Sequence, residues 1–371
     1  MGTYYRLRDG MRSIIITVPQ IPTALTVPLI MSRLRSVFVI ACAFALPATG
    51  SAQEKVLNLY TARHYQTDEA LYSNFTRQTG IRINRIEAPE DPLLERIKNE
   101  GANSPADVFI TVDVGRLWRA QQAGVFAQVK SAVLESRIPA QYRDPEGYWF
   151  GFSARARVIA YNKSTVKPGE IKSYEDLADP KWKGKVCTRS SGHVYTLSLI
   201  SSLVTHNGEG PTEQWARGLV ANLARDPKGG DTDQLAAVAS GECDVALSNT
   251  YYIVRLMRSS KPEDKAMAAK LGVVWPNQDN RGTQMNVSGG GMLKNAPNKE
   301  AALKFLEYLA SDEAQAYFAN GNNEWPVVPG VKVNNPELVA LGSFKADTIN
   351  VALLGKNQPV AQKIVDRVGF K

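Results

Sequence analysis

Apolar strand patterns alternate with helical patterns through the first third of the chain. Strand patterns lie at residues 55–60, 81–83 and 106–112, and helical patterns lie at 70–80, 92–99 and 117–123. Asp68 precedes the first helical pattern, where an acidic side chain favours a helix N-cap. Because such alternation is typical of a parallel sheet covered by helices, the pattern predicts an α/β fold.

A long apolar stretch from Trp149 to Tyr161 contains Arg155 and Arg157 at alternating positions. A strand of this length is long enough to cross from one domain to another. Further strand patterns lie at 183–188, 245–247, 271–275 and 286–293, and further helical patterns lie at 197–203, 211–223, 231–240, 299–309 and 312–319. Three consecutive glycines at 289–291 predict a backbone that passes close to another group. Because no low-complexity linker interrupts the pattern, we expect domains joined by crossing strands.

The stretch at 244–255 changes from a strand pattern to a helical pattern at a short polar turn, and two adjacent tyrosines stand at that change. Two other segments repeat the order of strand, polar turn, aromatic residue and helix. Ligands of α/β sheets bind where strands end. We therefore predict that aromatic residues from these three turns bind a hard metal ion. The candidate ligands are His64, Tyr65, Tyr195, Tyr251 and Tyr252.

The choice of tyrosine points to ferric iron. A phenol has a pKa of about 10, but a strongly charged cation next to it favours the phenolate. Ferric iron is a hard trication that prefers anionic oxygen donors, and helix N-termini stabilise such anions. Four phenolates around it leave one excess negative charge if His64 is neutral. Arg255 follows the tandem tyrosines on the same helix face and would offset this charge; the alternative is a solvated surface arginine.

The remaining histidines and the common catalytic motifs give little evidence for another kind of site. His193 lies two residues before Tyr195 and is a minor candidate for a ligand, whereas His206 precedes an Asn-Gly turn. The sequence has no Cys-x-x-Cys or His-Glu-x-x-His zinc motif, no Gly-x-Ser-x-Gly motif and no P-loop. No nucleophile with an orienting base is recognisable, so we expect a binding protein and not an enzyme.

Composition suits an exported globular protein. The 371 residues are 44% hydrophobic and 22% charged, which allows two domains. The net charge of +8 includes no basic run, which argues against nucleic-acid binding. Residues 31–52 have the basic, apolar and small-residue regions of a signal peptide, so residues 1–30 are expected to be a mis-assigned upstream extension. The apolar run is too short for a membrane span. A lipoprotein signal at Cys42 is the alternative.

Two cysteines, Cys187 and Cys243, would remain after export. Each lies eight residues before a candidate ligand, Tyr195 or Tyr251, which suggests two neighbouring strands of one sheet. An exported protein with an even number of cysteines can form a disulfide. A disulfide and a pair of buried free thiols both remain open.

The chain resembles the periplasmic ferric-iron-binding proteins of ABC transporters, a family that includes the cyanobacterial FutA proteins and the FbpA-like proteins. The resemblance covers residues from about 56 to 371 and is carried by segments 60–68, 189–195 and 243–252, with support from 289–294 and 322–326. It implies a two-lobed type II periplasmic binding protein fold, with mostly parallel sheets and helices on both faces. The implied lobes are residues 53–153 with a return at about 278–328, and residues 154–277 with a return at about 329–371.

The resemblance also implies a function and a site. The implied iron ligands are His64, Tyr65, Tyr195, Tyr251 and Tyr252, with Arg255 behind them. The protein would capture Fe(III) in the cleft between the lobes and deliver it to an ABC permease and ATPase in the inner membrane. It would act as a periplasmic monomer and would not be an enzyme.

Two other functions remain as alternatives. The same architecture could bind another small solute, such as a polyamine, thiamine or an oxyanion. A polyamine site would want carboxylates beside aromatics, which the tyrosine turns do not show. A secreted metal-dependent hydrolase would need an open coordination position and a general base. Five protein ligands without an adjacent Glu or Asp argue against that function.

Overall fold

The structure of the protein is a computed structural model that describes residues 55–63 and 65–371. The predicted signal peptide, the residues before it, Cys42 and the candidate ligand His64 lie outside the described residues. The described residues form one compact unit. Among the helices of the described part, none has the length and apolar character needed to cross a membrane.

Most of the predicted elements are present, with shifts of a few residues at their ends. The strands are β1 (Val56–Thr61), β2 (Arg82–Glu87), β3 (Val108–Val112), β4 (Phe150–Asn162), β5 (Val186–Cys187), β6 (Val245–Asn249), β7 (Leu271–Val274), β8 (Met285–Met292) and β9 (Trp325–Pro326). The first helices are α1 (Asp68–Thr79), α2 (Glu90–Glu100), α3 (Val114–Gln122), α4 (Ala132–Arg137), α5 (Val194–Asn207), α6 (Glu209–Ala221) and α7 (Asp231–Ser240). The others are α8 (Thr250–Arg258), α9 (Pro262–Lys270), α10 (Lys299–Leu309), α11 (Asp312–Asn322), α12 (Pro336–Val339), α13 (Ala352–Lys356) and α14 (Gln358–Val368).

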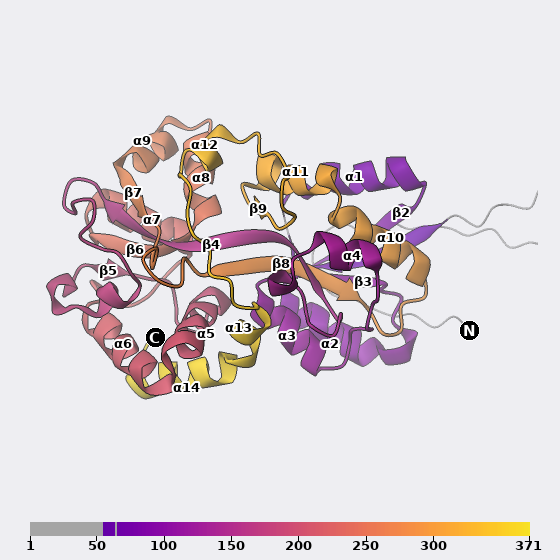
Figure 1. Cartoon of the computed structure of the whole chain (residues 1–371), viewed down its shortest axis with the longest axis horizontal. Coiled ribbons are helices and arrows are strands. Elements are labelled where there is room, and N and C mark those ends of the chain that lie inside the picture. Colours follow the sequence, from indigo (N-terminus) through magenta and orange to yellow (C-terminus); the bar gives the residue numbers. More distant parts are fainter. Residues whose placement is uncertain (1–54, 64) are drawn as a thin grey trace, which may run out of the picture. The chain divides into compact units, whose positions relative to one another are not determined.

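Strand β4 is the crossing strand that the sequence predicts. Its first half pairs with β8 and β9, and its second half pairs with β6 and β7. The strand order is β2-β1-β3-β8-β4-β6-β5, with β7 and β9 also paired to β4. Figure 1 shows β4 and β8 running side by side through the middle of the molecule. The two ends of β4 therefore belong to two different groups of strands.

The predicted parallel pairing is present in the strand pairs that do not involve β4 or β8. The pairs β1–β2, β1–β3 and β5–β6 are parallel, as their β-α-β connections require. The pairs that β4 and β8 make with their neighbours are antiparallel. The pattern of strands and helices along the chain does not show this, because the direction of β4 and β8 depends on how the chain returns to the sheet.

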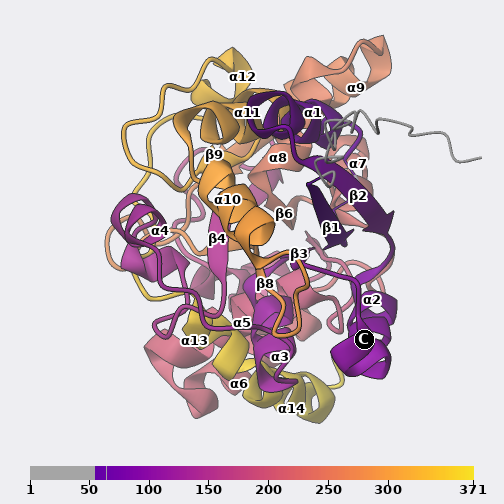
Figure 2. The same cartoon turned by 90° about the vertical axis from the view of Figure 1, so that its right-hand side faces the viewer.

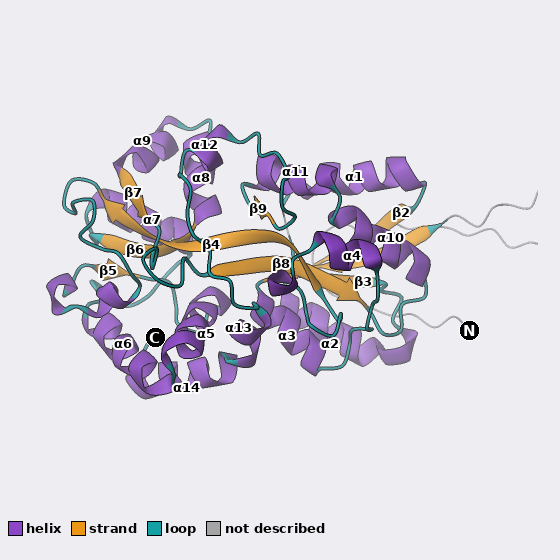
Figure 3. Ribbon diagram, viewed as in Figure 1, coloured by secondary structure: helices purple, strands orange, loops and turns teal. Residues whose placement is uncertain are grey.

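Helices cover both faces of the strands, as predicted (Figure 3). On the β1–β3 side, α1, α10 and α11 lie on one face and α2 and α3 on the other, as two perpendicular views show (Figures 1 and 2). One large apolar core fills this part and extends under β4 and β8. A second core forms where α5, α6 and α14 pack around β5 and β6.

The first helix begins differently from the prediction. Its N-cap is Thr67, and Asp68 is the first residue of α1. The buried carboxylate of Asp68 instead forms an ion pair with Arg63 at 2.8 Å. A buried arginine competes for the carboxylate because removing its charge from water is costly without close counter-charges, and Asp68 and Glu324 both supply one to Arg63.

The disulfide that the sequence leaves open is present between Cys187 and Cys243, whose Cα atoms are 5.8 Å apart. Cys187 ends β5, and Cys243 precedes β6, the parallel neighbour of β5. The bond therefore joins the end of β5, which leads to Tyr195, to the start of β6, which leads to Tyr251.

The three glycines of β8 lie against the backbones of its neighbours, which confirms the predicted close approach. A Cβ atom added to Gly290 would lie 2.5 Å from the carbonyl oxygen of Phe109, and one added to Gly289 would lie 2.3 Å from that of Phe150. The group that they approach is the backbone of strands β3 and β4. The glycines thus allow β8 to pack closely between β3 and β4.

Replacing Gly290 with Ala is expected to lower the free energy of unfolding by roughly 1–3 kcal/mol, because the new methyl group forces neighbouring strands apart. Urea denaturation followed by circular dichroism measures this change. Gly210→Ala is the matched control, since the Cβ position at Gly210 in α6 is open. That variant should be neutral or slightly stabilised. Equal stability of both variants would contradict the close approach.

Candidate metal centre

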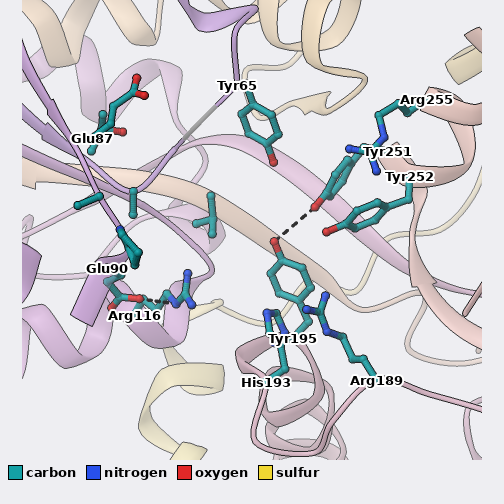
Figure 4. Close-up of a pocket in the computed structure, with 15 residues that line it drawn as sticks. Tyr65, Glu87, Glu90, Arg116, Arg189, His193, Tyr195, Tyr251, Tyr252 and Arg255 are labelled. Carbon is teal, nitrogen blue, oxygen red and sulfur yellow. Dashed lines mark hydrogen bonds and ion pairs between the residues drawn. The ribbon is translucent and has the colours of Figure 1, made fainter. Parts of the chain in front are cut away.

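Four tyrosines from three turns line one cavity of about 600 Å³. Tyr65 follows β1, Tyr195 lies in the first turn of α5, and Tyr251 and Tyr252 lie in the first turn of α8. Figure 4 shows their hydroxyl groups pointing toward one another. The structure thus brings together four of the five residues that the sequence singles out, and the fifth, His64, lies outside the described residues.

Ring contacts place the four phenols in one cluster. The hydroxyl oxygens of Tyr195 and Tyr251 are 3.5 Å apart. The ring centroids of Tyr251 and Tyr252 are 4.1 Å apart, and the ring of Tyr65 meets that of Tyr251 edge-on at 6.4 Å. Tyr251 therefore occupies the centre of the cluster and contacts each of the others.

The local sequence explains why the tyrosines lie at helix starts. The side chain of His193 caps α5, because its Nδ1 accepts a hydrogen bond from the backbone N–H of Tyr195 at 3.1 Å. Strand β6 ends at Asn249, and the next residue already begins α8. Helix N-termini carry partial positive charge, which favours an anionic oxygen nearby.

His193 lies at the cavity but has a structural task. Its ring lies edge-on to that of Tyr195, with centroids 4.6 Å apart. Burial and the charges of Arg189, Arg157 and Arg116 lower the pKa of His193 to about 2. The imidazole is therefore neutral and serves as a hydrogen-bond acceptor. His206 lies elsewhere, where its Nε2 is 2.7 Å from Asp347.

Burial keeps the phenols of Tyr65, Tyr195 and Tyr251 neutral when no cation is near them. Burial raises the pKa of Tyr251 well above its ordinary value, and the neighbouring tyrosines Tyr195, Tyr65 and Tyr252 raise it further, while Arg155 lowers it. Burial also raises the pKa of Tyr195 and of Tyr65. Ionising several phenols in one buried cluster requires a strong positive charge among them. The site is therefore suited to a highly charged cation.

Two arginines of β4 lie beneath the tyrosines. The guanidinium of Arg155 lies 5.4 Å from the ring centre of Tyr251, and that of Arg157 lies 6.0 Å from the ring centre of Tyr195. Both are almost fully buried. Nη1 of Arg155 and Nε and Nη2 of Arg157 have no hydrogen-bond partner. Alternating arginines in an apolar strand signal such a role, but the sequence alone did not connect them with the tyrosines.

Buried carboxylates balance these arginines. Arg155 forms an ion pair with Glu324 at 2.7 Å, and Arg157 forms one with Asp231 at 2.5 Å. Asp231 also binds Arg189, which lines the cavity. The positive charge beside the phenols is thus fixed in place by the fold.

Arg255 lies where its spacing predicts. Its guanidinium is 5.0 Å from the ring centre of Tyr252 and donates a hydrogen bond to Thr232 at 2.8 Å. The side chain is exposed and lines the cavity. Arg255 is therefore an exposed arginine that also lies against the ring of a candidate ligand.

The opposite wall of the cavity comes from the β1–β3 side. It contains Glu87, Glu90 and Arg116 (Figure 4). Burial raises the pKa of Glu90 to about 7, although Arg116 and Arg119 oppose this shift. Among the described residues, no group of three or more His, Cys, Asp and Glu side chains could hold a metal ion. The oxygen groups that gather at the centre of this cavity are the four phenols.

Comparison with known proteins gives consistent matches. A family model described as bacterial extracellular solute-binding protein matches residues 103–350. Iron uptake protein A1 of Synechocystis sp. is 53% identical over 319 residues, which cover 86% of this chain and 88% of that protein. The Fe(3+)-binding periplasmic protein of Serratia marcescens is 28% identical over 85% of this chain and 91% of its own length.

Solved structures match over the same region. A FutA protein of Trichodesmium, solved in complex with iron and citrate ligands, is 57% identical with a TM-score of 0.83 and is covered completely by 85% of this chain. A ferric binding protein from Campylobacter jejuni is 42% identical with a TM-score of 0.81, again with 85% of this chain and all of that one covered.

Proposed function

Because this chain belongs to the family of bacterial extracellular solute-binding proteins, we propose that it binds ferric iron for an ABC iron importer. The predicted two-lobed α/β fold of type II periplasmic binding proteins is confirmed by the close match to solved members. One observation carries the proposal: four tyrosines from three separate turns line a single cavity. Relatives over most of the chain are named for iron uptake and ferric iron binding.

The proposed ligands are the phenolate oxygens of Tyr65, Tyr195, Tyr251 and Tyr252, with His64 as the fifth. A ferric ion among them supplies the charge that buried phenols need in order to ionise. The four phenolates exceed the ion by one negative charge. Arg155, Arg157 and Arg255 lie next to the rings and offset that charge. Arg155 and Arg157 also have buried N–H groups without a hydrogen-bond partner, which favours an anion next to them.

In this proposal the protein is a carrier and not an enzyme. Lobe 1 is residues 53–153 with 278–328, and lobe 2 is residues 154–277 with 329–371. The lobes close on Fe(III), and a permease and ATPase in the inner membrane then receive the ion. Residues 31–52 direct the protein to the periplasm, where it acts as a monomer and where the disulfide can form.

Ferric citrate added to the purified iron-free protein is expected to produce a visible phenolate-to-iron charge-transfer band that saturates at one ion per chain. Dithionite should then release the iron, because four phenolates around Fe(II) leave two excess negative charges and weaken the complex. Absorbance and the iron content of the protein after desalting measure both steps.

Zinc is the control cation, since it gives no such band. A protein that stays colourless but binds spermidine or thiamine in calorimetry would point instead to another solute. Iron that remains bound after reduction as firmly as before would contradict the release step.

A further inference from the structure

Asp113 has an unusual backbone conformation between β3 and α3. Its φ is 80° and its ψ is 129°, and the residue is fully buried. A non-glycine residue in this region costs roughly 1–3 kcal/mol and persists only where surrounding contacts hold it. Such residues gather at functional sites, and the contacts of Asp113 therefore call for an explanation.

Three donors from three elements converge on the carboxylate of Asp113. Oδ1 accepts hydrogen bonds from the backbone N–H of Gly115 and from the hydroxyl of Ser198, both at 2.8 Å. Oδ2 accepts one from the side-chain amide of Asn286 at 2.7 Å. These donors belong to α3, α5 and β8. Hydrogen bonds to an ionised acceptor are stronger than those between neutral groups.

The bond to Ser198 reaches the helix that carries a proposed iron ligand. Ser198 and Tyr195 are three residues apart in α5, so they lie on one face of that helix. Both side chains are buried. Asp113 follows β3, whose partners among the described strands are β1 and β8, whereas α5 follows β5. The carboxylate therefore links β3, the neighbour of the strand that precedes Tyr65, to the helix that presents Tyr195.

We propose that Asp113 and Ser198 are positioning residues for the iron site. Their hydrogen bond holds the first turn of α5 against the β3–α3 turn, which keeps the Tyr195 oxygen beside that of Tyr251. The strained backbone conformation at Asp113 directs its carboxylate toward α5. A relaxed backbone conformation would direct the carboxylate elsewhere. This inference rests on the proposed function, since it concerns how one proposed ligand is held.

The strain is balanced by several contacts around it. The backbone N–H of Asp113 donates to the carbonyl of Val287 at 2.9 Å, and that of Val114 donates to the Asn286 side chain at 2.9 Å. Asn286 thus binds both the carboxylate and the following peptide. Removing only the Ser198 hydroxyl leaves these contacts in place, so it tests the link without dismantling the turn.

Ser198→Ala is the test, and Ser201→Ala is its matched control. Ser201 lies one turn further along α5, is fully buried, and its hydroxyl has no hydrogen-bond partner. We expect Ser198→Ala to lose iron to excess EDTA about tenfold faster than the wild-type protein, since one bond to a charged group is lost. The charge-transfer band of this variant should shift, because the distance between the Tyr195 oxygen and the iron is no longer fixed. Ser201→Ala should match the wild type in both measurements.

Asp113→Asn provides a second measurement that keeps the shape of the side chain. It should also release iron faster, because a neutral amide oxygen accepts more weakly from Ser198. The melting temperature of each iron-free variant is measured in parallel. A wild-type protein that binds no iron would refute the proposed function. A different result would overturn only the positioning role of Asp113 and Ser198. In that result the wild-type protein binds iron, and Ser198→Ala releases iron at the wild-type rate with an unchanged charge-transfer band. This holds whether or not the melting temperature of the variant falls.

Discussion

Replacing Tyr251 with Phe is expected to weaken ferric-iron binding at least about 100-fold and to remove much of the charge-transfer band. Loss of a residue that only supports a metal ligand costs 10–100-fold in affinity, so loss of a ligand should cost more. Tyr251 is the best choice because it lies at the centre of the cluster and contacts the other three rings. Titration of iron against competing citrate measures the affinity.

The control for this variant is Tyr308→Phe. Tyr308 is also buried, and its hydroxyl donates to the carbonyl of Leu71 at 3.0 Å, away from the cavity. It should lose only about 1 kcal/mol of stability and should bind iron normally. If Tyr251→Phe held iron as tightly as the control, phenolate coordination by this cluster would be wrong.

Glu324→Gln is expected to lower the free energy of unfolding by about 3–5 kcal/mol, the cost of breaking a buried ion pair from one side. The Glu324 carboxylate binds Arg155 at 2.7 Å and Arg63 at 3.2 Å, and it accepts a hydrogen bond from Ser153 at 2.6 Å. All of these side chains are buried. A neutral amide would leave Arg155 without its carboxylate partner and Arg63 with Asp68 alone. Chemical denaturation of the iron-free protein measures the loss.

The carboxylate of Glu324 should also make the free energy of unfolding depend on pH in the acidic range. Burial alone would raise the pKa of Glu324, but Arg155 and Arg63 outweigh it and lower the pKa to about 2, below the ordinary value of 4.5. A carboxylate with a lowered pKa contributes stability above its ordinary pKa, and this contribution is lost as the pH falls from about 4.5 towards about 2. The Gln variant should lack this part of the pH profile.

Glu263→Gln is the control for both measurements, because Glu263 is exposed in the first turn of α9. Its stability should stay within about 0.5 kcal/mol of the wild type. Equal stability of the Glu324 and Glu263 variants would show that the buried arginines do not depend on Glu324.

The candidate site was predictable because its signals are local. Each tyrosine stands where an apolar strand pattern gives way to a helical pattern, and carboxyl ends of strands gather at one edge. The crossing strand was predictable for a similar reason, since Trp149 to Tyr161 is apolar for longer than one sheet needs. Composition and periodicity therefore locate the candidate ligands and the strand that joins the two groups of elements.

The surroundings of the site were not predictable, because they depend on partners distant in sequence. Glu324 is 169 residues from Arg155, and Ser198 is 85 residues from Asp113. No periodic pattern relates positions so far apart. The antiparallel pairs of β4 and β8 were missed for the same reason, since strand direction is set by how the chain returns. The capping role of His193 was not predictable either, because its hydrogen bond to the backbone of Tyr195 depends on where α5 begins.

Strand β4 has a consequence for how a protein of this architecture can change its cargo. A cut after residue 153 would fall inside the strand and would separate its first residues from their ladder partners in β8. Such halves are not separate building blocks that recombination could trade between genes. New specificity has to arise instead by point substitution in the turns, while the shared strand is inherited whole.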